Sequence, residues 1–201
     1  MAGAGEPTRG DTVHVDVVDR WGNMISATPS GGWLYGSPVI PALGWPLGTR
    51  AQMFWLEEAL PSSLRPRARP RTTLAPGLAL RDGEPWLAWG TPGGDQQEQW
   101  ALHVFLRHVD RGLNLQEAID APEFHTEHLI SSFYPRGFVR RSLALESRFD
   151  PETVDGLRGR GHDVTLWPDW SLGRVTAVQR EDGQLRAAAN PRGMQGYAVG
   201  R

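Results

Sequence analysis

The stretch of sequence that decides the fold is GDTVHVDVVDRWGN, residues 10–23. Valine at every second position from 13 to 17 favours a β-strand, and the Arg-Trp-Gly-Asn that follows is typical of a hairpin turn. Thr12 stands at the head of this strand, directly after Asp11 and a flexible lead-in. That arrangement is typical of a self-cleaving enzyme in which a freed threonine becomes the N-terminal nucleophile.

Composition excludes several kinds of chemistry. The 201 residues are enough for one large domain or two small ones, and they include no cysteine, which removes disulfide frameworks, zinc–thiolate sites and cysteine nucleophiles. All 21 basic residues are arginine, so Schiff-base lysines, P-loop lysines and Ser–Lys dyads are also excluded. The net charge of −2 gives no global bias toward nucleic acid.

Nothing in the sequence predicts contact with a membrane. No apolar run approaches the ~20 residues of a membrane span, and residues 1–7 lack the apolar core of a signal peptide. The compartment is therefore unknown, and cytoplasmic by default. We expect residues 1–11 to be a leader or the remnant of a segment before a cleavage site, and residues 12–201 to form one domain.

Periodicity and turn residues predict a mixed fold. Residues 12–28 are expected to form a β-hairpin, and residues 29–50 a long irregular loop of the kind that is more often functional than not. The order of paired strands, then helices, then strands predicts an α+β fold with helices layered on antiparallel sheet. Further strands are expected at residues 74–81, 86–89, 124–129, 139–146, 162–167, 173–179 and 184–189, and helices at 52–60, 95–111, 115–121 and 150–161. Asp82-Gly83 and Asp182-Gly183 are expected to be hairpin turns, and Asp150 is expected to cap the last helix.

Thr12 needs a base before its hydroxyl can attack. A threonine hydroxyl is a weak nucleophile, and one solution is the residue's own free α-amine, whose pKa of about 7.7–8.0 leaves an appreciable fraction neutral. A peptide nitrogen cannot serve, because its lone pair is delocalised into the amide. Cleavage between Asp11 and Thr12 would therefore switch the base on.

Two further segments could serve the same chemistry. Gly93 and Gly94 follow Pro92 at an expected helix N-terminus, where backbone N–H groups can approach and stabilise a developing oxyanion. Most Gly-Gly pairs before a helix are only turns. The adjacent hydroxyls of Thr72 and Thr73 could bind a carboxylate, or the two residues could simply start a β-strand.

Taken together and in this order, the motifs resemble the C-terminal, small-subunit region of the gamma-glutamyltranspeptidase family, a group of N-terminal-nucleophile (Ntn) hydrolases. The resemblance covers nearly the whole chain and implies part of a four-layer αββα sandwich built from both subunits. The matching motifs are Thr12-Val13-His14, Val17-Val18-Asp19, Gly22-Asn23, Tyr35-Gly36-Ser37, RPRTTLAP at residues 69–76, GTPGG at residues 90–94, Ala121-Pro122, Phe124-His125, Gly161-His162 and Pro191-Arg192.

The resemblance also implies roles for individual residues. Thr12 falls on the nucleophile that autoproteolysis between Asp11 and Thr12 makes N-terminal. Ser30 falls on the hydroxyl residue that hydrogen-bonds the amine of the nucleophile, which is threonine in familiar members. Gly93 and Gly94 fall on the glycines of the oxyanion hole.

The segments expected to bind the substrate depart from the family's pattern. Thr72 and Thr73 replace a serine pair that contacts the α-carboxylate of the substrate, and Gly32 replaces an asparagine of the pocket. Met53 replaces the acid that grips the α-amino group, and Arg50 replaces a nearby Gln or Glu. Because a hydrogen bond to a charged group contributes ~1.5–3 kcal/mol, we expect a donor without a free α-amine, such as a glutaryl group, or one that is gripped differently.

The sequence thus predicts acyl transfer or amide hydrolysis of the glutathione hydrolase type. The expected substrate is a small-molecule amide, either glutathione-like or a simple acyl amide. The resemblance implies a large subunit of the same precursor as partner, and no metal or organic cofactor. A truncated or unprocessed, catalytically inactive family member is the alternative.

A basic stretch suggests one more class of partner. The arginines at 65, 67, 69 and 71 alternate with proline and alanine, which is compatible with a polyproline II segment that binds nucleic acid or another anion. The family resemblance explains this stretch better, so no nucleic-acid partner is expected. The histidines predict no metal site, because neither of their two close pairs has a convincing third ligand.

Overall fold

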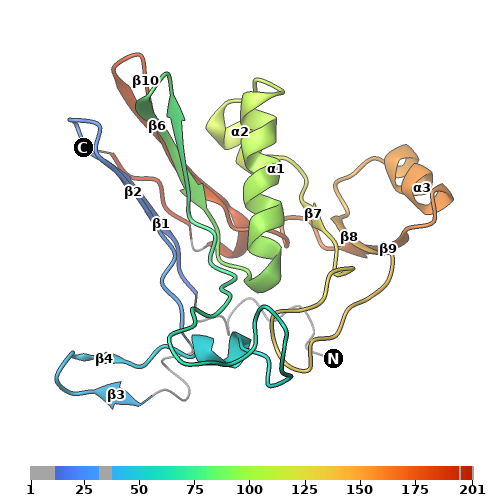
Figure 1. Ribbon diagram of the computed structural model, residues 1–201. Coiled ribbons are helices and arrows are strands. Elements are labelled where there is room, and N and C mark those ends of the chain that lie inside the picture. Colours follow the sequence, from blue (N-terminus) through green and yellow to red (C-terminus); the bar gives the residue numbers. More distant parts are fainter. Residues whose placement is uncertain (1–11, 32–37, 195, 201) are drawn as a thin grey trace.

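The computed structural model of the chain describes residues 12–31, 38–194 and 196–200. A hairpin, a four-stranded sheet and a pair of helices stack as layers, and a smaller sheet with its own helix lies to one side (Figure 1). Asp11, Gly32 and the Tyr35-Gly36-Ser37 motif, all of which the sequence singled out, lie outside the described residues.

The N-terminal hairpin forms as predicted. β1 (Val15–Val18) pairs antiparallel with β2 (Met24–Ala27), and the pairing extends to Val13, whose N–H donates to the Pro29 carbonyl at 3.1 Å. The Asp19 carboxylate closes the turn by accepting hydrogen bonds from the backbone N–H groups two and four residues later, both at 2.9 Å. The hydrogen bond between Val13 and Pro29 therefore fixes the open end of the hairpin, where Thr12 lies.

A four-stranded antiparallel sheet forms the centre of the molecule from β5 (Gly77–Arg81), β6 (Glu84–Gly90), β10 (Thr176–Glu181) and β11 (Gln184–Ala189). The strands lie in the order β11-β10-β6-β5. Two-residue Asp-Gly turns join β5 to β6 and β10 to β11, as predicted. Both turns have positive φ at each position, 54° and 87° in the first and 52° and 73° in the second, which is the geometry that closes a tight hairpin.

Two helices cover one face of this sheet. α1 (Gln97–Val109) follows a single 3₁₀ turn, η2 (Gly94–Gln96), and α2 (Leu115–Asp120) begins with a capping box. Both helices lie within their predicted ranges. Their apolar sides share the main core with the sheet, and its buried members include Trp86, Leu87, Trp100, Val104, Leu115, Ala118, Ile119, Ala177 and Ala188.

The N-terminal hairpin packs on the other face of the sheet, with β1 and β2 against β10 and β6 (Figure 1). Ser26 donates a hydrogen bond from its hydroxyl to the Trp89 carbonyl at 3.1 Å, and Thr176 donates one to Asp16 at 2.8 Å. The layers therefore run hairpin, sheet, helices, which is the α+β arrangement that the sequence predicted.

A second, smaller unit contains β7 (Phe124–His125), β8 (Ser142–Glu146), β9 (Asp163–Trp167) and α3 (Pro151–Gly159). α3 starts as predicted, because the Asp150 side chain accepts a hydrogen bond from the Thr153 N–H at 2.7 Å. β7 and β8 are shorter than the strands expected at 124–129 and 139–146. β8 and β9 pair in parallel, since α3 carries the chain back between them.

The segment between the hairpin and the main sheet differs most from expectation. It holds a two-strand ribbon of β3 (Val39–Ile40) and β4 (Trp45–Pro46) and the short 3₁₀-helix η1 (Arg50–Met53). The helix predicted at residues 52–60 is wrong. Ala59 adopts a left-handed φ of 68° and Leu56 is 86% exposed, so beyond Met53 the segment has neither helical backbone nor a buried apolar face.

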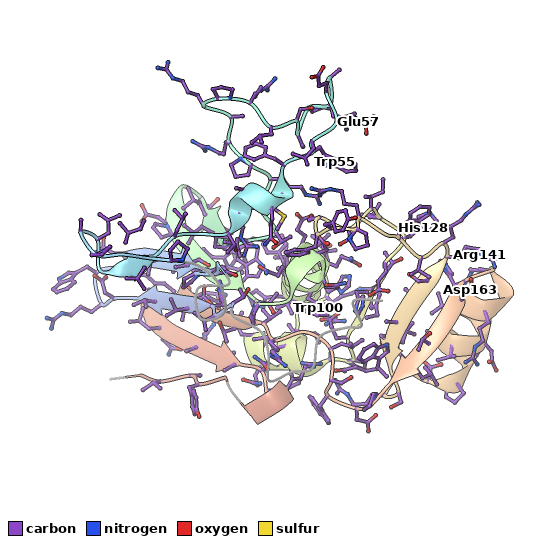
Figure 2. All side chains as sticks on the ribbon, turned by 90° about the horizontal axis from the view of Figure 1, so that it is seen from below. Trp55, Glu57, Trp100, His128, Arg141 and Asp163 are labelled. Carbon is purple, nitrogen blue, oxygen red and sulfur yellow. The ribbon has the colours of Figure 1, made fainter. Side chains whose placement is uncertain are left out.

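The stretch after η1 stands away from the main layers and carries Trp55 and Glu57 (Figure 2). Near the C-terminus a last 3₁₀ turn, η3 (Arg192–Met194), follows β11. None of the described helices is long and apolar enough to cross a membrane.

Candidate active site

Thr12 meets Ser30 at the open end of the hairpin. Thr12 Oγ1 and Ser30 Oγ lie 2.7 Å apart, and the Thr12 side chain is half-buried. The hydrogen bond between Val13 and Pro29 holds the two chain segments in register and so fixes this approach. The structure therefore brings together the predicted nucleophile and its predicted hydroxyl partner, and the contact it describes is between the two hydroxyls.

Arg50 completes this chain of hydrogen bonds from η1. Its Nη2 donates to Ser30 Oγ at 2.6 Å. Because a guanidinium can only donate, the Ser30 oxygen accepts from Arg50. In the contact between Ser30 and Thr12 either hydroxyl can be the donor.

The Arg50 guanidinium also has a hydrogen-bond donor that is not satisfied within the described residues. Its Nε is buried and has no hydrogen-bond acceptor among the described residues. A buried guanidinium N–H without an acceptor is costly, and a carboxylate is the group that best satisfies a guanidinium. The residue predicted to bind substrate is thus a cation two hydrogen bonds from the nucleophile oxygen.

His14 and Asp16 anchor the hairpin beneath this site. The buried His14 ring lies 2.7 Å from the Thr28 hydroxyl through Nδ1 and 2.9 Å from Asp16 Oδ1 through Nε2. The second Asp16 oxygen accepts from Thr176 on β10 at 2.8 Å. We did not predict Asp16 as part of the site, although its spacing of two from His14 places both side chains on one face of the strand.

The His14 ring also brings Thr12 close to the glycine loop. It lies so close to Gly90, the last residue of β6, that a Cβ there would overlap it. Thr12 is two residues before His14, and Gly93 is three residues after Gly90. The nucleophile and the predicted oxyanion loop are therefore at the same end of the two stacked β-layers.

The loop between β6 and α1 has the backbone that the two glycines were expected to allow. Gly93 has φ 143° and Gly94 has φ 59°, and residues other than glycine rarely adopt either backbone angle. A Cβ at Gly93 would overlap the ring of Trp100, a residue of α1 that lies near the centre of the molecule (Figure 2). Among the described residues, the Gly93 N–H has no hydrogen-bond acceptor, whereas the Gly93 carbonyl accepts from the Gln96 N–H at 3.2 Å.

Thr72 and Thr73 are placed differently from each other. The Thr73 side chain is buried, whereas Thr72 is exposed and its hydroxyl accepts a hydrogen bond from the Leu74 N–H at 3.1 Å. Within the described part of the chain neither threonine hydrogen-bonds to Thr12. Met53, at the position of the family's acid, is buried and only 1% exposed.

The Pro191-Arg192 motif has a structural role. The buried Arg192 guanidinium donates to Glu146 at 2.8 Å and to the carbonyls of Ile119 and Ala121 at 2.7 and 2.9 Å. Burial alone would raise the pKa of Glu146, but hydrogen bonds from Arg192 and Arg148 outweigh it and hold that pKa below its usual range. This motif therefore locks the C-terminal segment to α2 and β8.

The Phe124-His125 motif also belongs to the core. His125 is buried with its ring edge-on to Trp100, at a centroid distance of 5.4 Å. Burial lowers the pKa of His125 to about 4, and the neighbouring His103 adds to the shift. Among the described residues, no group of three His, Cys, Asp or Glu side chains could hold a metal ion.

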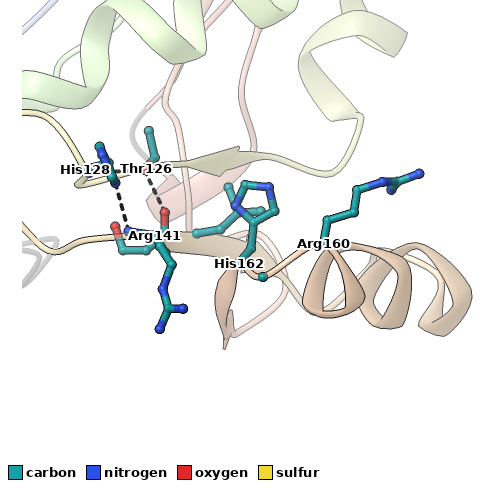
Figure 3. Close-up of a pocket in the computed structure, with 8 residues that line it drawn as sticks. Thr126, His128, Arg141, Arg160 and His162 are labelled. Atoms are coloured by element: carbon teal, nitrogen blue, oxygen red, sulfur yellow. Dashed lines mark hydrogen bonds between the residues drawn. The ribbon is translucent and has the colours of Figure 1, made fainter.

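A cavity of about 350 Å³ lies elsewhere, in the small unit of β7, β8 and β9 (Figure 3). Its labelled lining residues are Thr126, His128, Arg141, Arg160 and His162. None of the residues predicted for the active site lines it. The Arg141 guanidinium is already paired with Asp163 at 3.2 Å, and the Arg141 N–H donates to His128 at 2.8 Å.

Comparison with known proteins identifies the family. The model of the gamma-glutamyltranspeptidase family matches residues 2–200. The chain belongs to the gamma-glutamyltranspeptidase family. The resemblance that the sequence motifs carried is therefore confirmed.

Curated relatives include the glutathione hydrolase-like YwrD proenzyme of Bacillus subtilis, 32% identical over 96% of this chain and 36% of that protein. The oxamate amidohydrolase proenzyme of Klebsiella pneumoniae is 36% identical over 95% of this chain and 36% of that protein. The chain thus spans about a third of the length of these curated relatives, both of which are named as proenzymes.

Solved structures support the same fold. The structure of LmbA2991HD is 60% identical over 98% of this chain and 36% of that chain, with a TM-score of 0.87. The gamma-glutamyltranspeptidase from Pseudomonas nitroreducens is 23% identical with a TM-score of 0.72, and it matches 94% of this chain and 99% of that chain. This gamma-glutamyltranspeptidase family member therefore has the Ntn-hydrolase fold, and its counterpart in the Pseudomonas structure is a separate chain.

Proposed function

We propose that this chain carries the nucleophile and the oxyanion loop of an amide-hydrolysing or acyl-transferring enzyme of the glutathione hydrolase type. The observation that carries the proposal is the hydrogen-bonded chain from Thr12 through Ser30 to Arg50, at the end of the hairpin beside the Gly93 loop. A nucleophile held by a hydroxyl and a cation has the fixed geometry that attack on a carbonyl requires.

The reaction begins with cleavage between Asp11 and Thr12, which frees the Thr12 α-amine. The amine takes the proton from Thr12 Oγ1, and Oγ1 attacks the carbonyl carbon of the donor amide. The Gly93 N–H stabilises the negative oxygen that forms, and the amine of the donor then leaves with the proton. The resulting ester on Thr12 is released by water, which gives hydrolysis, or by an acceptor amine, which gives transfer.

The rest of a longer precursor is the proposed partner. Its support is the proenzyme names of the curated relatives and the one third of their length that this chain spans. The Pseudomonas structure, in which a chain of matching extent stands by itself, supports release of this segment as a small subunit. The large subunit would then close the site over a small-molecule amide.

Arg50 and Met53 favour a donor that the enzyme recognises through a cation, whereas the resemblance implies that the family usually recognises the donor's α-amine through an acid. Met53 offers no acid for a donor α-amine, while Arg50 presents a cation with an unpartnered N–H next to Ser30. One relative is named for oxamate, which carries a carboxylate beside its amide and no α-amine. We therefore infer that the donor is an amide with a carboxylate and without an α-amine.

Two measurements test the proposal. In the protein expressed with the remaining precursor sequence, mass spectrometry is expected to find a chain that begins at Thr12, and Thr12→Ala is expected to abolish both release and turnover. Only intact chain in the purified wild type would favour the inactive alternative. For the donor, the measurement is kcat/KM for γ-glutamyl amides, for glutaryl amides and for oxamate. A value for γ-glutamyl amides that is ten or more times the values for the other two would overturn the inference about Arg50.

A further inference from the structure

Gln97, in the first turn of α1, is fully buried next to the glycine loop. Its carboxamide faces three backbone groups from two separate segments. Oriented with nitrogen toward the carbonyls, it donates to the Thr91 oxygen at 3.0 Å and to the Thr73 oxygen at 3.2 Å, and its own oxygen accepts from the Gly94 N–H at 3.3 Å. This is the orientation in which every one of these buried groups has a partner of the right kind.

These bonds fix successive peptide groups of the loop. Gln97 holds the carbonyl of Thr91 and the N–H of Gly94. Between them the Pro92 carbonyl accepts from the Thr91 hydroxyl at 2.7 Å, and the Gly93 carbonyl accepts from the Gln96 N–H at 3.2 Å. The donor left without an acceptor among the described residues is the Gly93 N–H, whereas the N–H of Gly94, the other glycine implied for the oxyanion hole, is bonded to Gln97.

Trp100, on the same face of α1 as Gln97, packs against the glycine loop. Trp100 lies three residues after Gln97, and residues at this spacing are neighbours on a helix surface. Its ring contacts the Gly93 position so closely that no side chain fits there. Trp100 thus limits how far the loop can move toward the core, and Gln97 limits how its peptide groups can rotate.

We propose that Gln97 is a positioning residue for the oxyanion donor, a role that rests on the proposed function of Thr12 and Gly93. By bonding Gly94 and Thr91, its carboxamide turns the Gly93 N–H outward from the loop. By bonding Thr73, it holds that loop at a fixed distance from the predicted substrate-binding segment. Removal of one well-placed oxyanion donor costs about 10²–10³ in rate, so misplacement of this one is expected to cost about ten- to a hundred-fold in kcat.

Gln97→Met tests the role in the complete, processed enzyme, because it keeps length and apolar bulk but removes all three hydrogen bonds. The matched control is Gln99→Met on the same turn. Gln99 also bonds the backbone through its carboxamide, but away from the loop. It accepts from the Thr126 N–H at 2.9 Å and donates to the Thr126 carbonyl at 3.0 Å. We expect Gln97→Met to lower kcat about ten-fold or more with little change in KM, and Gln99→Met to keep kcat. Equal losses in the two variants would overturn the proposal.

A second variant separates positioning from a general loss of stability. In Gln97→Glu, a protonated carboxyl can accept from Gly94 and donate to a carbonyl as glutamine does, whereas an ionised one faces two carbonyl oxygens. The ratio of variant to wild-type kcat is therefore expected to fall as the pH rises through the pKa of the new carboxyl, which burial raises. A ratio that does not change with pH contradicts the role.

Hydrogen exchange gives a readout that does not depend on turnover. The Gly94 N–H is expected to exchange slowly in the wild type and faster in Gln97→Met, while Gln99→Met should speed exchange at Thr126 alone. Rapid exchange at Gly94 in the wild type would overturn the proposed contact even if the enzyme is active. If the wild type shows no turnover but Gly94 is protected by Gln97, the contact stands and it is the proposed function that fails.

Discussion

Ser30 lies between Arg50 and Thr12, the proposed nucleophile, and is hydrogen-bonded to both. Ser30→Ala removes the oxygen that lies 2.7 Å from Thr12 and leaves the Arg50 N–H without its acceptor. We expect kcat to fall about ten- to a hundred-fold, since a hydrogen bond to a charged group contributes ~1.5–3 kcal/mol. Steady-state kinetics on the processed enzyme measure this.

The control for Ser30 is the conservative change Ser30→Thr. It keeps the hydroxyl, so it is expected to retain most of the activity, and it matches the threonine of familiar family members. A kcat for Ser30→Ala equal to that of Ser30→Thr would show that the hydroxyl has no part in the reaction.

The sequence predicted some of these residues better than others. Thr12, Ser30 and Gly93 could be named because each lies in a short motif with its own chemistry or its own family counterpart. The contact of Arg50 with Ser30 could not, because it depends on how the irregular segment between them folds back. Gln97 was missed for another reason: a glutamine in the first turn of a helix is ordinary, and only burial against three backbone groups distinguishes it.

Strands β1 and β6 depend on close packing between His14 and Gly90. A Cβ at Gly90 would overlap the buried His14 ring, which is itself bonded to Thr28 and Asp16 and cannot move aside. Gly90→Ala is therefore expected to lower the free energy of unfolding by about 1–3 kcal/mol, the usual cost of overpacking. Urea unfolding measures the change.

Gly137→Ala provides the control for this substitution. Nothing lies within 4 Å of a Cβ at Gly137, and its φ is not in the left-handed region. It should leave the free energy of unfolding nearly unchanged. Similar values for the two variants would mean that the hairpin can shift relative to β6 at little cost.

His125, on β7, makes the packing against α1 sensitive to pH. Its pKa is about 4 in the folded chain and 6.5 when unperturbed, so between these values the unfolded chain takes up a proton that the folded chain does not. The free energy of unfolding should therefore fall as the pH falls from about 6.5 to 4, by about 3 kcal/mol at most, with no contribution above that window. His125→Phe keeps a ring beside Trp100 and cannot take up the proton.

The measurement is urea unfolding of both proteins at several pH values across that window. Titrating groups that do not interact with His125 act equally in the wild type and in His125→Phe, so the difference between the two pH dependences reports on His125 and its coupling to His103. A variant that loses as much stability as the wild type on acidification would refute the assignment.

At the scale of elements, prediction succeeded where local chemistry is decisive. The Asp-Gly turns and the capped start of α3 are specified by neighbouring residues, and each forms where it was expected. The helix expected at 52–60 has no comparable start or stop signal, and Met53 is the one residue of that range that is buried. The parallel pairing of β8 with β9 is a long-range feature that strand patterns alone do not specify.

The whole molecule leaves the outer face of the N-terminal hairpin open. Val13, Val15 and Val17 are 57%, 47% and 48% exposed, while the polar His14 and Asp16 between them point toward the central sheet. A strand that turns its apolar side outward is expected when another layer covers it. In the αββα sandwich of the family, that layer would come from the remainder of the precursor.

Two carboxylates introduced on this face by substitution test that expectation. Val15→Glu with Val17→Glu places carboxylates on a surface that is half-exposed in this chain, so the stability of the isolated chain should change little. Covering each valine is expected to contribute about 1 kcal/mol, and burying an unpaired carboxylate costs more, so association with the rest of the precursor should weaken about ten-fold or more per site.

Co-purification of the two parts and recovery of activity on mixing them measure the association. Val139→Glu is the matched control, because that valine is 52% exposed and lies outside the layered part of the molecule. If the double variant assembles as well as this control, the covering layer packs elsewhere, and the outward valines must then be explained by some other contact. If it alone fails to assemble, the hairpin that positions Thr12 is also the surface on which the two parts of the enzyme meet, so that release of the nucleophile and closure of the site would depend on the same element.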